Sequence, residues 1–182
     1  WDNCFGEIQF PKSSYSGEWK NGKFHGNGSY KDNEGDLYIG KFEENILKDK
    51  KGLIYYRNKS LYEGEIYNKP NGYGKIVLSN GGTYTGEFKN GKMNGKGYLV
   101  NSNGKYQGEW ILGRLSLGKF TQNENLKYFG YFDQEYQFSG WGALEKKGDF
   151  YYEGEFVSGI FEGEGKIIFD NGKIYEGYFY QG

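Results

Sequence analysis

Side chains that could carry out catalysis are few in this sequence. One histidine, His25, and one cysteine, Cys4, are present, so neither a zinc site nor a Ser-His-Asp triad can be argued from them. Glutamates recur three residues after a tyrosine, at Glu18, Glu65, Glu87, Glu109 and Glu155. A catalytic pair needs two carboxyls converging in one dry cleft, whereas a repeating row fits a solvent-facing strand surface. We therefore predict no enzymatic activity, no metal and no cofactor, and we place His25 in a solvated turn.

Gly-x-Gly pairs are a second candidate, because glycine-rich loops can bind phosphate. The pairs at Gly72 and Gly163 lack the third glycine of a dinucleotide-binding fingerprint. Gly165-Lys166 is followed by isoleucine, where a P-loop has serine or threonine. Glycines within strands explain these pairs.

The densest basic cluster could meet an anionic surface. It consists of Lys48, Lys50, Lys51, Arg57 and Lys59. Near a charged membrane each basic residue contributes about 1 kcal/mol, so anionic lipid or an acidic partner is one interpretation, and a solvated loop is the plainer one. Residues 1–127 carry 19 basic and 14 acidic side chains, and residues 128–182 carry 4 and 10. The net charge of −1 and the regular glutamates argue against nucleic acid.

The local pattern that would position the side chains discussed above is clearest in residues 84–105. Tyr84, Gly86 and Phe88 alternate with polar residues, which predicts a strand, and Asn90-Gly91 predicts a tight hairpin turn. A two-residue turn there would pair Phe88 with Met93, Gly86 with Gly95 and Tyr84 with Gly97. A ring lying over a cross-strand glycine would fill the space that the missing side chain leaves.

This pattern recurs along the whole chain. Tyrosines that open a strand are each followed two residues later by glycine, and they are Tyr15, Tyr38, Tyr62, Tyr84, Tyr106, Tyr128, Tyr152 and Tyr175. Their spacing of 22 to 24 residues is typical of a repeat architecture. We therefore predict one all-β domain over residues 1–182, a single elongated, twisted antiparallel meander of tandem hairpins without helices. Half-units at both ends suggest a fragment of a longer protein.

The combined motif, Y-x-G-x-[WF]-x-x-G followed by G-x-G, resembles the MORN (membrane occupation and recognition nexus) repeat. The first, fourth and seventh units match it throughout, beginning at Tyr15, Tyr84 and Tyr152. The second has Asn45 and Asp49 in place of two glycines, the third has lost its turn motif, the fifth keeps only Gly118, and the sixth has Glu135 at the turn. The resemblance implies one hairpin per repeat, laid side by side. It also implies a scaffold in a cytoskeletal, ciliary, cortical or membrane-contact assembly. The single cysteine fits a reducing compartment, so we expect a cytoplasmic location.

The aromatic face is the predicted binding surface. We expect fifteen rings on one face of a single-layer sheet: Tyr15, Trp19, Tyr38, Phe42, Tyr62, Tyr84, Phe88, Tyr106, Trp110, Tyr128, Phe132, Tyr152, Phe156, Tyr175 and Phe179. A bare sheet would expose more apolar surface than a monomer usually does. A helix or extended segment of another protein, or a second copy, should therefore cover it.

Two alternatives remain open at this stage. The first is a peripheral membrane module that binds anionic phospholipid through the basic cluster. The second is the non-catalytic repeat region of a larger enzyme, such as a lipid kinase or a SET-domain methyltransferase.

Overall fold

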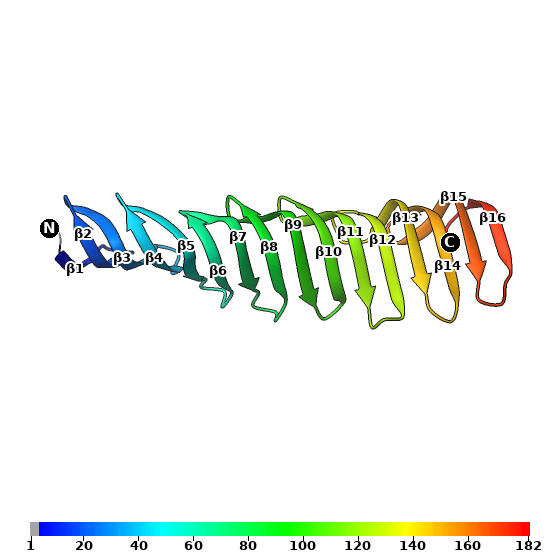
Figure 1. Cartoon of the computed structure of the whole chain (residues 1–182), viewed down its shortest axis with the longest axis horizontal. Coiled ribbons are helices and arrows are strands. Elements are labelled where there is room, and N and C mark those ends of the chain that lie inside the picture. The colour runs from blue at the N-terminus through cyan, green and yellow to red at the C-terminus, as the bar shows by residue number, and fades with distance from the viewer. Residues whose placement is uncertain (1–3) are drawn as a thin grey trace. The chain divides into compact units, whose positions relative to one another are not determined.

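The computed structural model describes residues 4–182, and there the chain forms strands and turns without a helix. Sixteen strands form one open antiparallel sheet in chain order (Figure 1), which confirms the predicted meander. They are β1 Cys4–Gln9, β2 Ser14–Lys20, β3 Lys23–Lys31, β4 Leu37–Glu43, β5 Ile46–Tyr55, β6 Leu61–Tyr67, β7 Lys69–Val77, β8 Thr83–Lys89, β9 Lys92–Asn101, β10 Gly104–Ile111, β11 Arg114–Gln122, β12 Leu126–Phe132, β13 Phe138–Lys146, β14 Phe150–Val157, β15 Ile160–Phe169 and β16 Ile174–Phe179.

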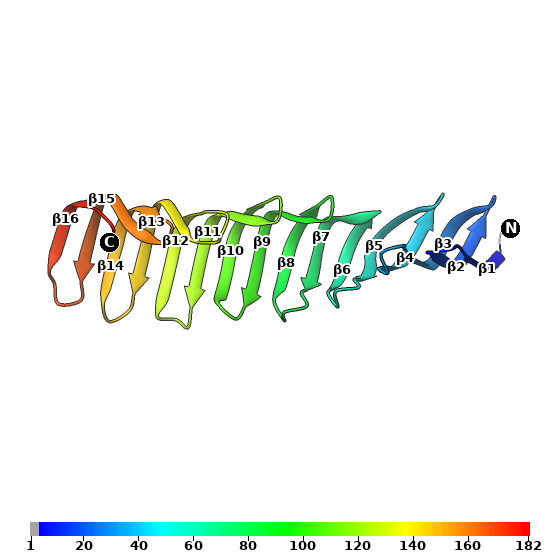
Figure 2. The same ribbon diagram turned by 180° about the vertical axis from the view of Figure 1, so that it is seen from behind.

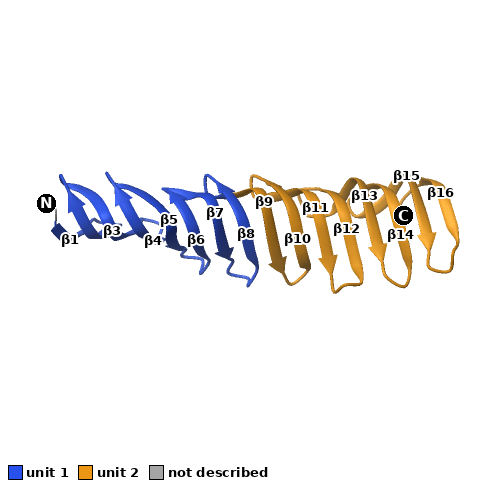
Figure 3. Ribbon diagram, viewed as in Figure 1, with its two compact units in different colours: residues 1–92 blue, residues 93–182 orange. Residues whose placement is uncertain are grey.

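The chain divides into two compact units, one ending at residue 92 and the other spanning residues 93–182 (Figure 3). Within each unit every hairpin lies beside the next, as the views from the two sides agree (Figures 1 and 2). The described residues include no helix that could span a membrane. A single domain over residues 1–182 stays a prediction.

A row of glycines crosses the sheet. In the compact unit of residues 93–182, each strand contributes one glycine that is paired with the glycine of the neighbouring strand. The row runs Gly97, Gly108, Gly118, Gly130, Gly142, Gly154, Gly165 and Gly177. Gly118, the one glycine of the Gly-x-Gly pair that the irregular fifth unit keeps, belongs to this row. The row therefore explains why the second glycine of Gly-x-Gly is the one that persists.

In the hairpins equivalent to residues 84–105, the pairing that a two-residue turn requires holds beside the turn and fails beyond it. In β2–β3 Trp19 faces Phe24, as the two-residue turn requires, but Gly17 faces Gly28 and Tyr15 faces Tyr30. The hairpins β6–β7 and β14–β15 show the same shift. Each of these three second strands contains a bulge at the first glycine of Gly-x-Gly. A glycine is needed there because Gly26 and Gly163 have φ values of +57° and +66°.

The regular glutamates stabilise these bulges. Glu18 Oε1 accepts hydrogen bonds from the Asn27 backbone N–H at 2.8 Å and from Asn27 Nδ2 at 3.1 Å. Glu65 Oε1 likewise accepts from the backbone N–H of Tyr73 at 3.1 Å. The glutamate row is exposed, as expected, but at these positions it has a structural role that the strand pattern did not predict.

Rings form the core of this single-layer sheet. In a regular hairpin the tyrosine ring lies over the paired glycines, so that a Cβ added at Gly28 would come within 2.8 Å of the Tyr15 ring. Its hydroxyl donates to the carbonyl three residues ahead, as in Tyr15 to Glu18 at 2.8 Å and Tyr152 to Glu155 at 3.0 Å. We call such a tyrosine seated. Six of the eight strand-opening tyrosines make this bond: Tyr15, Tyr62, Tyr84, Tyr128, Tyr152 and Tyr175.

Seated rings also join neighbouring repeats. The Tyr152 ring stacks on Phe161 of its own hairpin with centroids 3.9 Å apart, and meets Phe179 of the next hairpin edge-on at 5.0 Å. Edge-to-face pairs of this kind contribute roughly 0.5–1.5 kcal/mol beyond the buried area. Core packing thus continues from repeat to repeat without a second layer.

One local prediction was wrong. His25 lies within strand β3 and is half-buried, not in a solvated turn. The turn ends earlier, at Lys23, because Asn21 and Gly22 both take positive φ values and close the hairpin in two residues.

Candidate functional site

Most of the fifteen predicted groove rings are core residues. Twelve are buried: Tyr15, Trp19, Phe42, Tyr62, Tyr84, Phe88, Tyr106, Trp110, Tyr128, Phe132, Tyr152 and Phe156. Tyr38 and Phe179 are half-buried and Tyr175 is exposed. The broad exposed aromatic face expected of a bare sheet is therefore largely absent among the described residues, because the twelve buried rings are covered by their own and neighbouring hairpins.

Two hairpins depart from the seated arrangement, those of the second and fifth units. In both, a leucine takes the place over the glycine row that a tyrosine occupies elsewhere. A Cβ at Gly40 would meet Leu47 Cδ1 at 3.1 Å, and one at Gly108 would meet Leu115 Cδ1 at 3.0 Å. In the regular first and seventh hairpins the residue at the sequence position of this leucine is a phenylalanine, Phe24 or Phe161. Its ring stacks on the seated tyrosine. Tyr38 and Tyr106 are thereby displaced.

The second hairpin closes its bulge without the lost glycines, although its register shift is larger than that of the regular hairpins. Asp49 replaces the first glycine of Gly-x-Gly, and its carboxylate accepts hydrogen bonds from the backbone N–H groups of Lys41 and Lys51, each at 2.9 Å. Lys41 stands where regular repeats have the bulge glutamate. The carboxylate has therefore moved to the opposite strand and still bonds the backbone at the bulge. The expected distortion is seen in the displaced ring and in the register, which shifts between Ile39 and Phe42 by one residue more than between Gly17 and Trp19 of the first hairpin.

The two displaced tyrosines have different surroundings. Tyr106 is 6% exposed and is enclosed by Phe120, Phe132 and Tyr136, whose ring centroids lie 4.7, 6.2 and 6.0 Å away. Tyr136 comes from the turn of the next hairpin, and its hydroxyl donates to the Gly113 carbonyl at 3.2 Å. The half-buried Tyr38 instead borders an open hollow.

This hollow, of about 460 Å³, is the candidate site. Its floor is formed by the buried Phe42 and Leu47, and its walls by half-buried rings. The full lining is Phe10, Ser13, Phe24, Tyr30, Asp32, Tyr38, Phe42, Asn45, Leu47 and Asn68. A concave, largely apolar site with a few polar groups is the usual form of a binding pocket. The sequence prediction included only Tyr38 and Phe42 of this set.

One rim of the hollow is fixed by Asp32. Its Oδ1 accepts hydrogen bonds from the backbone N–H groups of Glu34, Gly35 and Asp36 at 2.9, 2.9 and 3.0 Å. Its Oδ2 accepts from the Tyr38 hydroxyl at 3.1 Å. Burial and the nearby Asp32 charge raise the pKa of Tyr38 well above its usual value. Asp32 therefore holds the displaced ring and has little capacity left for a ligand.

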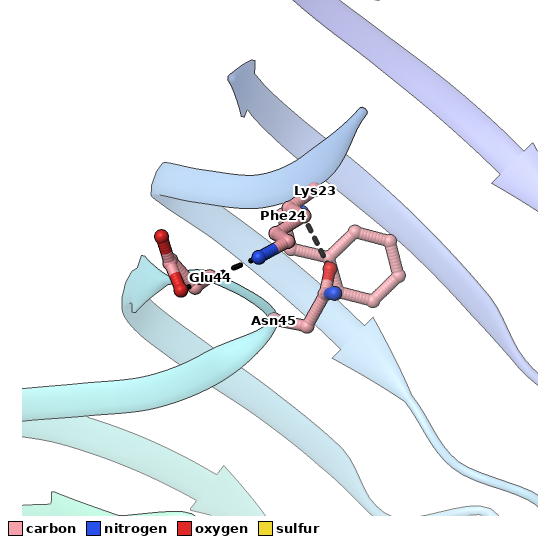
Figure 4. A network of polar contacts seen from close by, with 4 residues as sticks. All are labelled: Lys23, Phe24, Glu44 and Asn45. Atoms are coloured by element: carbon pink, nitrogen blue, oxygen red, sulfur yellow. Dashed lines mark hydrogen bonds and ion pairs between the residues drawn. The ribbon is translucent and has the colours of Figure 1, made fainter. Parts of the chain in front are cut away.

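The opposite rim carries two asparagines at equivalent turn positions. Asn45 and Asn68 have φ values of +68° and +56°, so each replaces a turn glycine without losing the turn. The Asn45 backbone N–H donates to the Phe24 carbonyl at 3.0 Å, and Asn45 Oδ1 accepts from the Phe24 N–H at 2.7 Å (Figure 4). Asn68 makes the same two bonds to Leu47, at 2.8 and 3.3 Å. Within residues 4–182 neither Nδ2 has a hydrogen-bond partner.

The predicted basic cluster is split by the fold. Lys48, Lys50 and Lys51 lie near the start of β5, whereas Arg57 and Lys59 lie in the turn after its end. At about 3.3 Å per residue, the six residues from Lys51 to Arg57 separate the two groups by roughly 20 Å. Lys48 is also paired with Glu43 at 2.9 Å. Lipid binding by these five residues stays a prediction, and the described residues hold no cluster of His, Cys, Asp or Glu suited to a metal ion.

The remaining lining residues could have been found from the sequence in part. Asn45 and Asp49 stand out as departures from the motif, and Leu47 stands where the first and seventh units have phenylalanine. What the sequence did not indicate is that a leucine there displaces the tyrosine. Phe10, Tyr30 and Asp32 carry no repeat signal that marks them as pocket residues.

Two solved structures are partly similar to this chain. The SAS-4 (dCPAP) TCP domain of Drosophila melanogaster, in complex with a proline-rich motif of Ana2 (dSTIL), is 11% identical, with a TM-score of 0.49, 96% of this chain covered and 90% of that chain. The TCP10 domain of Danio rerio CPAP, in complex with a peptide of Danio rerio STIL, is 10% identical, with a TM-score of 0.42 and coverages of 97% and 100%. A comparison with curated proteins finds no match.

A family model gives the sequence-level result. The MORN repeat model matches residues 15–37, 62–83, 84–105 and 152–174. Three of these segments begin the units whose motif is complete, at Tyr15, Tyr84 and Tyr152. The second, fifth and sixth units, where the motif is broken, lie outside the matched segments. The chain therefore contains MORN repeats, at four places along its sequence.

Proposed function

We propose that this chain is a non-enzymatic interaction module that binds an extended segment of a partner protein in the hollow of the second repeat. The observation that carries the proposal is the displaced Tyr38, which borders an aromatic-walled hollow in a face where twelve of the fifteen predicted rings are buried. Half-buried rings supply contact area at low entropic cost, as anchor sites in interfaces require.

The asparagine rim favours an extended segment over a helix. Asn45 and Asn68 occupy the same position in successive hairpins, which are about 10 Å apart when two strands of roughly 4.8 Å separate them. Each has an Nδ2 group available to donate. An extended chain presents backbone carbonyls to such donors, whereas the carbonyls within a helix are already bonded internally.

The predictions of a longer groove and of a cellular setting have less support than the hollow. A partner laid along all fifteen rings would have to displace core contacts, so we restrict the site to the hollow. A cytoskeletal, ciliary or cortical setting is supported by the repeat family alone. Self-association, lipid binding and a catalytic region elsewhere in a longer protein remain untested predictions.

A selection experiment tests the proposed site without a known partner. Linear twelve-residue peptides displayed on phage would be selected on the whole chain, and their affinities measured by calorimetry. Asn45→Asp with Asn68→Asp keeps the acceptor oxygens and removes the donors, so we expect at least a tenfold weaker affinity. Asn90→Asp, at a turn outside the hollow, is the matched control.

Two outcomes would count against the proposal. Peptides whose affinity ignores Asn45, Asn68 and Tyr38 would place the site elsewhere. Peptides that lose affinity when a central residue is replaced by proline, and that turn helical on binding, would show that the hollow binds a helix instead.

A further inference from the structure

The outer face of the last hairpins carries a second hollow, which the proposed function does not use. It measures about 440 Å³ and its floor is the backbone of Gly165 and Gly177 in the glycine row. On the other face, the rings of Tyr152 and Tyr175 lie against these two glycines. The side chains around this hollow therefore belong to the surface opposite the core.

The two ends of this hollow are aromatic. Trp141 on β13 is 51% exposed and Tyr178 on β16 is 68% exposed. Three strand spacings of about 4.8 Å place them roughly 14 Å apart across the sheet. Apolar side chains this large are usually covered, and a pair of them at the ends of one trough forms an unpartnered surface of the sheet.

Carboxylates line the trough between the rings. Glu153, Glu164 and Glu176 border it together with one base, Lys166. Lys166 is paired with Glu176 at 2.9 Å. No ion pair joins Glu153 or Glu164 to a base in the described part of the chain, and Glu153 only accepts a hydrogen bond from the Tyr151 hydroxyl at 3.3 Å. The trough therefore carries an uncompensated negative charge.

The surrounding charge has the same sign. Residues 128–182 hold 10 acidic and 4 basic side chains. Such a field attracts cations and repels acidic partners. Aromatic faces beside carboxylates are also the chemistry that binds arginine and lysine, through cation–π contact and charge-assisted hydrogen bonds.

We infer that this trough binds a basic extended segment of a partner protein, with arginine or lysine side chains on Trp141 and Tyr178 and the chain lying over the glycine backbone. An extended chain advances about 3.3 Å per residue, so side chains four positions apart match the separation of the two rings. Bare glycine backbone lets the bound chain approach closely, because no side chain stands in its way. This surface is independent of the hollow at Tyr38.

Calorimetry with a synthetic probe tests the inference. The probe is a sixteen-residue Gly-Ser peptide with arginine at every fourth position, and its partner is the whole chain. We expect Trp141→Ala and Glu164→Gln each to raise Kd at least fivefold, and a change from 50 to 300 mM NaCl to raise it at least tenfold. These side chains are exposed, so melting curves should show that both variants fold like the parent.

The matched control is Tyr73→Ala, which removes another exposed ring of the outer face, 58% exposed. Tyr73 lies beside Lys75, in the compact unit that ends at residue 92. It should leave Kd unchanged. Binding that falls with Glu164→Gln but ignores Trp141→Ala would show general attraction to an acidic face and overturn the inference. An equal loss with Tyr73→Ala, or no binding of the probe at 50 mM NaCl, would overturn it as well.

Discussion

The seventh and second hairpins differ mainly in where one phenol ring lies. In the seventh, Tyr152 is seated over Gly154 and Gly165 and stacked on Phe161. In the second, Leu47 covers the glycine, and Tyr38 swings to Asp32 at the rim of an open hollow. The repeat motif therefore describes the core of the sheet, and the hollow that we propose as the binding site lies where the motif is broken. The fifth hairpin supports this distinction, since its displaced Tyr106 packs against Tyr136 and is only 6% exposed.

Replacing Tyr152 and Tyr38 by alanine should give the largest difference in stability between a core ring and a ring of the proposed site. Tyr152→Ala should lower the free energy of unfolding by about 3–5 kcal/mol, the usual cost of deleting a buried aromatic side chain. Tyr38→Ala should cost less than half as much, because its ring is half-buried and lacks the stack. Urea unfolding followed by circular dichroism measures both, and equal losses would contradict the distinction between seated and displaced rings.

Adding a methyl group to a glycine that lies under a seated tyrosine should have the next largest effect on stability. In Gly142→Ala the new methyl would lie 2.5 Å from the Tyr128 hydroxyl and 2.6 Å from its ring. Overpacking of this kind costs about 1–3 kcal/mol. Combining it with Tyr128→Leu, which removes the ring over the glycine, should cost less than the sum of the single changes. Additive losses in this double-mutant cycle would show that ring and glycine are not coupled.

Restoring the regular residue should close the hollow. Leu47→Phe places a stacking ring where Phe24 and Phe161 stand in regular repeats. We expect peptides selected on the hollow to bind at least tenfold more weakly, a change of about 1.4 kcal/mol. Leu115→Phe makes the same substitution in the covered fifth hairpin and should leave the affinity unchanged. Similar losses in both variants would indicate a general effect on the sheet.

Alkaline pH should weaken the core through its seated rings. Burial raises the pKa of Tyr15, Tyr128 and Tyr152 from 10.0 to about 12. The folded chain holds these protons more tightly than the unfolded chain, so their contribution to stability is complete below pH 10 and is lost as pH rises from 10 to about 12. Urea midpoints between pH 8 and 11.5 should fall, and less steeply in Tyr152→Phe. A Tyr152→Phe midpoint that falls as steeply as that of the parent would argue against this cause.

The smallest effect is expected at the rim. Asn45→Gly keeps a residue suited to positive φ and removes the side-chain bond to Phe24, which should cost about 0.5–1 kcal/mol. Peptide affinity should fall further than stability, because the donor to the partner is lost as well. Thermal melts and calorimetry on one sample compare the two, and an unchanged affinity would remove Asn45 from the site.

Much of the fold could be predicted from the sequence because its determinants are local. Strand alternation and the Asn-Gly turns predict the meander, and the register next to the turn follows from Trp19 and Phe24. The bulge could not be predicted, because it depends on Glu18 reaching the backbone of the opposite strand. Burial of the rings depends on contacts between repeats, such as Tyr152 with Phe179. The aromatic row was therefore identified correctly as a set while its exposure was overestimated.

The side-chain amide resonances of Asn45 and Asn68 test the central claim most directly. In ¹⁵N-labelled protein we predict that both NH₂ groups shift when a selected peptide is added, because they donate to its backbone carbonyls, while that of Asn90 stays in place. Unchanged Asn45 and Asn68 resonances, with shifts gathered on other repeats, would show that the hollow at Tyr38 is not the binding site.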